Sequence, residues 1–300
     1  MLKIAYHPCY AHPLPEGHRF PMEKYRLLPE QLLYENTCTE VNFFQPKAAQ
    51  YDDIALVHTS DYIQKLESLS LSYQEARAIG FPVSKALVER EKIIAQGTIT
   101  GAMFALKTGI AFNIAGGTHH AYRNHGEAFC LYNDQAIAAQ YLLNNNLAKQ
   151  ILIVDLDVHQ GNGTAEIFSE NPQVFTCSMH GKNNYPFRKE HSDLDIELPN
   201  NTDDSTYLKE LKNHLPRLVE QLEPDFIFYL SGVDILASDK LGKLGCSLTA
   251  CKERDKYVLS LCKNNHIPVQ CSMGGGYSAD IKTIIEAHAN TYRIAQELFF

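Results

Sequence analysis

The apolar positions of the chain fall into short, nearly unbroken runs separated by longer stretches in which apolar residues recur every three or four positions. The short runs are rich in β-branched and aromatic residues and are bounded by Gly, Pro and Asn, which is typical of buried strands. The longer stretches are typical of amphipathic helices, and the clearest lies at 205–222. Seven strands are predicted in this way, at 2–6, 41–44, 110–116, 151–158, 173–179, 226–232 and 267–273.

The alternation of strands and helices predicts the fold class. Strands separated by helices form right-handed βαβ units, so we expect an α/β fold with a mostly parallel central sheet and helices on both faces. No Pro/Gly/Ser-rich linker and no internal repeat divides the sequence, which predicts a single domain over 1–300. The least periodic stretch, 67–84, is expected to form a surface loop or lid.

Four of the predicted strands run directly into polar segments at their carboxyl ends. The segments read "THHA" after "FNIAGG", "DLDVHQGNG" after "ILIV", "VD" after "FIFYLSG" and "GGGYS" after "VQCSM". Sites in parallel sheets lie beyond the carboxyl ends of the strands. If these four strands are neighbours, the four segments converge on one crevice.

A metal site is the best interpretation of the acidic strand ends. Asp155, Asp157 and His159 alternate, so in an extended chain their side chains point the same way. A lone Asp-x-His pair is more often a helix cap beside a hydrogen-bonded His, but two buried carboxylates on one face favour a cation. With Asp234 as a third ligand, Asp157 and His159 could hold a catalytic zinc that keeps one position open. A two-manganese site is disfavoured because its D-x-H-x-D run would need Asp in place of Gly161.

Other residues of these segments could carry acid–base chemistry. His119 and His120 could be further metal ligands, but acid–base catalysis suits them better because imidazoles titrate near neutral pH. A carboxylate such as Asp155 could orient one ring. Tyr277 could be a packed side chain on a flexible turn, or it could donate its phenol OH to an oxyanion. Gly117 would let the backbone approach the site closely.

Composition narrows the partners and the compartment. The formal net charge of −8 argues against a nucleic-acid-binding surface and is compatible with cationic partners such as lysine-rich tails or polyamines. Eight cysteines without a CxxC pair are typical of reduced thiols, and no apolar run is long enough for a membrane span. A cytoplasmic location is expected, with no direct nucleic-acid binding.

The motifs "GGTHHA", "AFCLYND", "DLDVHQGNGT", "SGVDIL" and "GGGY", in this order, resemble the metal-dependent histone deacetylase superfamily. This superfamily includes acetoin utilisation proteins and acetylpolyamine amidohydrolases. The resemblance runs from about Tyr6 to the carboxyl terminus, and "ILASDKLGKLGCSLT" and "YPFRKEHSDLDIELP" look most like the class IV branch. It implies an arginase-like α/β sandwich and a histone deacetylase-like catalytic domain over 1–300.

The resemblance also implies a role for each matching residue. The implied zinc ligands are Asp157, His159 and Asp234. The implied catalytic residues are His119 with its partner Asp155, His120 with its partner Asn162, and Tyr277. The implied substrate contacts are Phe129, Tyr185 and Gly117, and a structural potassium ion is implied at Asp155, Asp157, Ser178 and Met179. Asn162 departs from class I enzymes, which carry Asp at this position, so the basicity of His120 cannot be transferred from them.

The implied activity is zinc-dependent removal of acyl groups from the ε-amine of lysine in proteins. Water attacks the amide, His120 moves protons, and Tyr277 stabilises the oxyanion. The class IV resemblance predicts that acyl chains longer than acetyl are preferred. An amidohydrolase for small acylated amines such as acetylpolyamines is the alternative. A catalytically silent acyl-lysine reader is less favoured, because every proposed catalytic position is occupied.

Overall fold

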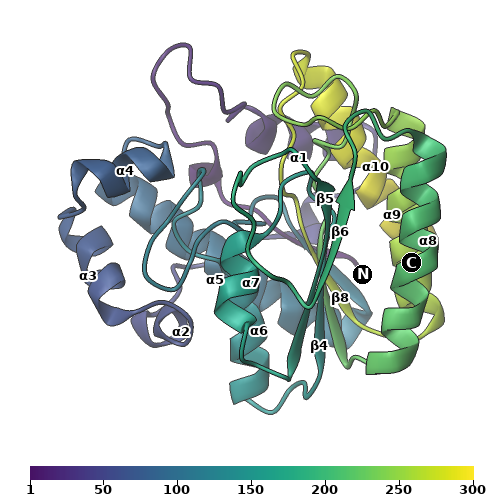
Figure 1. Cartoon of the computed structure of the whole chain (residues 1–300), viewed down its shortest axis with the longest axis horizontal. Helices are drawn as coiled ribbons and strands as arrows, with labels where there is room; N and C mark the ends of the chain where they lie inside the picture. The colour runs from purple at the N-terminus through teal and green to yellow at the C-terminus, as the bar shows by residue number, and fades with distance from the viewer.

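An eight-stranded sheet crosses the centre of the computed structural model, which describes residues 1–300 (Figure 1). Its strands are β1 (Lys3–Ala5), β2 (Phe43–Phe44), β3 (Ile110–Asn113), β4 (Ile151–Asp155), β5 (Val174–Gly181), β6 (Leu194–Leu198), β7 (Phe226–Leu230) and β8 (Val269–Ser272). Their spatial order is β2-β1-β3-β8-β7-β4-β5-β6, and every neighbouring pair is parallel. The predicted α/β fold is confirmed, and the sheet is entirely parallel.

Helices cover both faces of this sheet. They are α1 (Lys24–Tyr34), α2 (Tyr51–Ala55), α3 (Ser60–Ser68), α4 (Tyr73–Ile79), α5 (Lys85–Thr108), α6 (Asp134–Asn144), α7 (Asn162–Phe168), α8 (Asp204–Leu222), α9 (Leu248–Asn264) and α10 (Ile281–Phe299), with short 3-10 helices at Pro8–Tyr10 and Glu40–Asn42. Figure 1 shows α5, α6 and α7 on one side of the sheet and α8, α9 and α10 on the other, with α2 to α4 lying outside α5. None of the helices combines the length and the apolar character that crossing a membrane requires.

The central strands form the rigid floor of the molecule. Every residue of β3, β4, β7 and β8 is buried, which accounts for their unbroken apolar sequences. On the face covered by α8, α9 and α10, Phe112 of β3 stacks on Tyr292 of α10 with ring centroids 4.2 Å apart. Parallel strands covered on both faces present only their ends to solvent, so polar side chains at those ends are held on a fixed base.

One strand is absent from the sequence prediction. Strand β6 pairs with β5 at the edge of the sheet and is only partly buried. Its sequence, "LDIEL", alternates apolar residues with Asp195 and Glu197. Acidic residues are depleted in strands but tolerated on an exposed edge, so composition alone hides this element.

The expectation of a loop or lid at 67–84 is wrong. This stretch contains the end of α3 and the whole of α4. Ser72 caps α4 in a reciprocal capping box with Glu75, and Gly80 ends it in the left-handed conformation. Such caps stabilise a helix by about 1 kcal/mol each. A sequence of about two turns can therefore form a helix although its apolar positions show little periodicity.

Candidate active site

The four polar strand ends lie side by side. The strands that carry them, β3, β8, β7 and β4, are consecutive in the sheet. Because all four are parallel, their carboxyl ends meet at one edge. The predicted convergence on a single crevice is therefore confirmed at the level of the fold.

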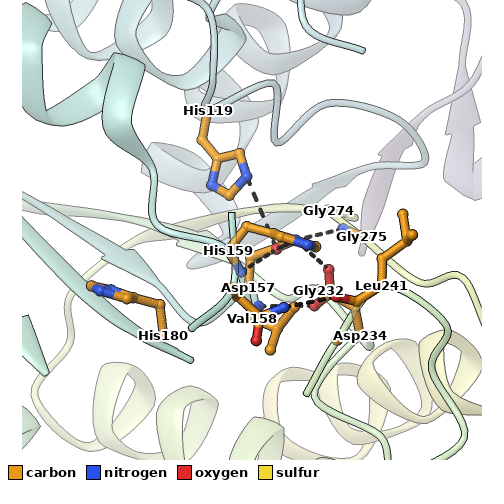
Figure 2. Close-up of polar contacts among 12 residues, drawn as sticks. His119, Asp157, Val158, His159, His180, Gly232, Asp234, Leu241, Gly274 and Gly275 are labelled. Carbon is orange, nitrogen blue, oxygen red and sulfur yellow. Dashed lines mark hydrogen bonds and ion pairs between the residues drawn. The ribbon is translucent and has the colours of Figure 1, made fainter. Parts of the chain in front are cut away.

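Asp157, His159 and Asp234 form a compact, buried group at this edge (Figure 2). Their ligand atoms all lie within 4.8 Å of one another. The Nδ1 atom of His159 lies 2.9 Å from Asp157 Oδ1 and 3.2 Å from Asp234 Oδ2. Asp234 Oδ2 is buried but receives no hydrogen bond. Two carboxylates and an imidazole in this arrangement are a donor set that suits a divalent cation such as zinc.

The backbone holds these side chains in place, but not by the predicted mechanism. Strand β4 ends at Asp155, and the next residues form a bend, so the extended-chain argument for Asp157 and His159 is wrong. Each carboxylate instead accepts a hydrogen bond from the amide two residues later, from Asp157 N to Asp155 Oδ1 and from His159 N to Asp157 Oδ1. This local bond favours a turn over a continued strand. Amides of other segments fix the remaining oxygens: Val158 N donates to Asp234 Oδ1, and Gly275 N donates to Asp157 Oδ2.

The electrostatics of the group favour positive charge. Burial and the neighbouring Asp157 carboxylate raise the pKa of Asp234 to about 7. Burial opposes ionisation of Asp157 too, but the imidazoles of His119 and His159 hold its pKa well below the usual value. Burial acts to lower the pKa of His159, yet the neighbouring Asp157 and Asp234 carboxylates raise it to about 10. The position between the two carboxylates therefore calls for a proton or a metal cation, and the residues present fit a metal.

His119 and His120 turn into the same cavity, with ring centroids 4.1 Å apart. His119 Nδ1 lies 2.7 Å from Asp155 Oδ2, and a carboxylate there fixes the proton on Nδ1. Burial acts to lower the pKa of His119, but Asp155 and Asp157 outweigh it and raise the pKa. His120 has the opposite shift, because burial and then the positive charge of His119 hold its pKa well below the usual value. Environments that separate two neighbouring pKa values are typical of paired acid and base groups.

Asn162 lies between His120 and the carboxylate of Glu127 and forms hydrogen bonds with both. Its Oδ1 lies 2.6 Å from His120 Nδ1, while its amide group donates to the Tyr122 hydroxyl at 2.9 Å and to Glu127 Oε2 at 3.4 Å. These donations fix the orientation of the amide, so His120 must donate from Nδ1 and present Nε2 as an acceptor. Glu127 also accepts a hydrogen bond from the Tyr185 hydroxyl at 2.5 Å. The negative charge therefore lies behind the amide rather than against the imidazole.

Tyr277 faces the metal group from the segment after β8. Its ring centroid lies 6.2 Å from that of His159, and its backbone amide donates to Asp239 Oδ2 at 2.6 Å. Burial, with the charges of Asp157 and Asp234, raises the pKa of Tyr277 well above the usual value. The phenol therefore stays protonated and can donate a hydrogen bond.

Aromatic rings line the way in. Phe129 and Tyr185, the predicted walls, both border the cavity, and the Tyr185 ring stands nearly perpendicular to that of His120 with centroids 5.0 Å apart. Phe20 and Phe81 were not predicted, but their centroids lie 5.2 Å and 5.0 Å from that of Phe129. Phe129 has a φ of 72°, and a hydrogen bond from its amide to the carbonyl of Ile79 at the end of α4 holds this left-handed turn.

Two glycines allow neighbouring segments of the site to pack closely against each other. Gly117 has a φ of 76° and lines the cavity, and a Cβ there would lie 2.9 Å from Gly274 Cα. A Cβ on Gly275 would lie 2.0 Å from Asp234 Oδ2. Both positions therefore need glycine on steric grounds.

Two further polar residues support this site without having been predicted. Lys24 of α1 is fully buried, donates to the carbonyl of Gly274 at 3.0 Å, and lies 5.4 Å from the Tyr277 ring centroid. Burial lowers the pKa of Lys24 to about 8, although Asp234 and Asp157 act in the other direction. Asp239 holds the amide of Tyr277. The sequence signal for Asp239 is the stretch "ILASDKLGKLGCSLT", whereas Lys24 resembles an ordinary surface lysine at the start of an amphipathic helix.

The residues of the predicted potassium site lie on adjacent strands. Asp155 of β4 is paired in register with Ser178 of β5, and Met179 follows it. Ser178 Oγ lies 3.0 Å from His180 Nδ1. In Figure 2, His180 lies to one side of the Asp157 and Asp234 group, separate from it.

Comparison with known proteins gives a consistent answer. The sequence model of the histone deacetylase domain matches residues 18–292. The chain is 44% identical over 296 residues to an uncharacterised protein of Picosynechococcus sp., covering 99% of both chains. It is 31% identical to the acetoin utilisation protein AcuC of Staphylococcus aureus, covering 88% of this chain and 73% of that protein.

Solved structures agree with these relatives. The crystal structure of a histone deacetylase homologue in complex with SAHA superposes with a TM-score of 0.84 at 26% identity, covering 97% of this chain and 82% of the other. The agreement therefore extends over nearly the whole chain. The protein belongs to the histone deacetylase family.

Proposed function

We propose that this protein is a zinc-dependent deacylase that removes acyl groups from the ε-amine of lysine. The observation that carries the proposal is the convergence of the Asp157, His159 and Asp234 group, the tandem histidines and the Tyr277 phenol on one aromatic-lined cavity. A metal group, a proton-transfer pair and an oxyanion donor in one place are what amide hydrolysis requires.

Asp157, His159 and Asp234 would hold the zinc ion. When bound, zinc supplies Lewis acidity, which polarises a carbonyl oxygen and acidifies water. Asp155, Asp157, Ser178 and Met179 are proposed to hold a structural potassium ion beside it. The rest of the chemistry falls to the protein's own side chains.

His120 is the proposed proton carrier. Its pKa lies well below the usual value, so the ring is neutral near pH 7 and its Nε2 atom can accept a proton from the attacking water. Returning that proton to the leaving amine completes the reaction. His119, whose pKa is raised and whose Nδ1 is held by Asp155, contributes positive charge beside the reacting carbonyl.

Tyr277 is the proposed oxyanion donor. Its phenol stays protonated at neutral pH, and it faces the same cavity as the two histidines. A hydrogen bond from this hydroxyl to the carbonyl oxygen strengthens as negative charge develops there, which is the differential interaction that accelerates hydrolysis. Lys24, fixed on the carbonyl of Gly274, supports the glycine segment that carries Tyr277.

The size of the inner cavity favours acetyl groups. The cavity lined by His119, His120 and Tyr277 measures about 40 Å³. An octanoyl chain would need the surrounding side chains to move. The cavity therefore favours acetyl-lysine over the longer acyl chains that the class IV resemblance predicts.

A panel of acetyl-, octanoyl- and myristoyl-lysine peptides, assayed with zinc analysis of the same preparation, tests the proposal. We expect one zinc per chain and the fastest turnover with acetyl-lysine. Faster turnover of octanoyl- or myristoyl-lysine would contradict the cavity argument but not the deacylase function. A protein with stoichiometric zinc and no turnover of any acyl amide would instead be a reader of acyl-lysine.

A further inference from the structure

A second, wider cavity opens directly outside the proposed active site. It measures about 380 Å³ and shares His120, Phe129, His159 and Tyr277 with the inner cavity, and we call it the mouth. Two of the residues that line it, Arg19 and Lys243, are cationic, and its lining contains no Asp or Glu. In a chain with a net charge of −8, this is a local reversal of charge.

Both cations are exposed, held in position and without an acidic partner. The Arg19 guanidinium lies over the ring of Phe129, 5.0 Å from its centroid, and forms no ion pair. Lys243 donates from Nζ to the carbonyl of Asn183 at 2.8 Å, and its backbone amide donates to Asn184 Oδ1 at 3.2 Å. Neither contact neutralises the side chain's charge, so two positive charges face the solvent of the mouth.

Two carboxylates that contact residues of the mouth are engaged by other groups of the protein. Glu127 accepts the Tyr185 hydroxyl and lies 3.5 Å from His125 Nε2, and the hydrogen bond with His125 contributes most to holding its pKa below the usual value. Asp239 accepts the backbone amides of Tyr277, Leu241 and Gly242. Neither carboxylate lines the mouth.

We propose that the mouth binds a carboxylate close to the acyl amide, with Arg19 and Lys243 as the specificity-determining residues. The inference rests on the proposed deacylase function and specifies its substrate class. The carboxylate could be an acidic side chain flanking acyl-lysine in a polypeptide or the α-carboxylate of free acyl-lysine. Acylated polyamines, which carry positive charge next to the amide, are disfavoured by the same two residues.

The test compares substrates that differ only in charge. Three acetyl-lysine peptides are flanked by Asp, by Asn or by Lys, and acetylputrescine represents the amines. We expect kcat/KM to be about fivefold higher for each added carboxylate at low salt, which is the upper range for exposed charge pairs, and to converge at 0.5 M NaCl. Free Nε-acetyl-lysine compared with its carboxamide separates the two carboxylate sources.

Variants of the mouth assign the effect to these residues. In Arg19→Gln/Lys243→Gln and in Lys243→Gln alone, the ratio of kcat/KM for the Asp-flanked peptide to that for the Asn-flanked peptide should fall towards one. The matched control is Lys256→Gln, which removes an exposed lysine of α9 outside the mouth. Equal rates for the Asp- and Lys-flanked peptides, or a preference that persists in the double variant, would overturn the proposal.

A binding measurement keeps this inference separate from the proposed function. Fluorescently labelled versions of the three peptides can be titrated into the Tyr277→Phe protein, in which turnover is slowed. Tighter binding of the Asp-flanked peptide supports the mouth proposal even if no acyl amide is hydrolysed, in which case only the deacylase function fails. Equal binding of all three peptides rejects the mouth proposal whatever the enzyme does.

Discussion

A negative charge placed directly against His120, at position 162, should shift the pH dependence of catalysis. In the native protein, Asn162 Oδ1 lies 2.6 Å from His120 Nδ1, and the Glu127 carboxylate lies 3.4 Å behind the amide. The change is Asn162→Asp, made alone and together with Glu127→Gln. Neither substitution alters side-chain shape, so the effect is electrostatic.

The magnitude follows from the two distances. A full charge pair at 2.6 Å is worth at most about 6 kcal/mol at an effective dielectric constant of about 20. A new carboxylate 3.4 Å from Glu127 is repelled by about 5 kcal/mol by the same formula, which raises the pKa of the new carboxyl group and keeps it partly protonated while Glu127 is charged. The double variant removes this repulsion, and we expect it to raise the pKa of His120 by about one to three units, the usual effect of an adjacent opposite charge. Asn162→Asp alone should raise it less.

The assay is the pH profile of kcat/KM, whose acidic limb reports protonation of the base in the free enzyme. The pKa of His120 lies well below 6.5 in the native protein, so activity should fall only at pH values below that. In the double variant the limb should move to higher pH, because the new carboxylate raises the pKa of His120. Glu127→Gln alone is the control and should leave the limb below 6.5. An acidic limb that does not move in the double variant would refute the role of His120 as the proton acceptor.

Three further changes test other parts of the site and fold. Tyr277→Phe should lower kcat at least a hundredfold with zinc content unchanged, on the scale of a lost oxyanion donor, and near-normal turnover would exclude Tyr277 from this role. Asp234→Asn should lose zinc, and a variant that retains one zinc per chain would contradict the ligand assignment. Chelation by EDTA should lower the Tm of the native protein but leave the Tm of this variant unchanged. Gly275→Ala should lose at least a hundredfold in activity because its Cβ would lie 2.0 Å from Asp234 Oδ2, while Gly101→Ala, whose Cβ has 3.5 Å to Gln270 Cγ, should be close to native.

The sequence predicted the site better than its surroundings, for a physical reason. Carboxylates and imidazoles at the end of a buried strand are so costly that they mark a site by themselves, and Asp157, His159 and Asp234 were found in this way. Lys24 carries no such signal, since its burial depends on Gly274, which is 250 positions away. The mouth residues Arg19 and Lys243 likewise acquire meaning only when folding places them around one cavity.

Net charge does not describe the mouth for the same reason. The value of −8 is compatible with cationic tails or polyamines as partners. The fields of exposed charges are screened within about 8 Å at physiological salt, so a substrate in the mouth responds to the charges there and not to the sum over the surface. The helical stretch at 67–84 was missed through a comparable limit, because its caps, and not its periodicity, stabilise it.

The motif "DLDVHQ" shows how identical side chains acquire different roles after the strand has ended. Both oxygens of Asp155 are engaged, Oδ1 by the Asp157 amide and Oδ2 by His119 Nδ1, so this carboxylate supports a histidine. Asp157 accepts one backbone amide on each oxygen, from His159 and from Gly275, and its Oδ1 also lies 2.9 Å from His159 Nδ1. Asp234 accepts only the Val158 amide on Oδ1, and its Oδ2 accepts nothing although it is buried. A buried oxygen without a donor is costly, so the demand for a cation is greatest at Asp234. Spacing in the sequence cannot separate these three acids, because the difference lies in which backbone amides the fold brings to each oxygen.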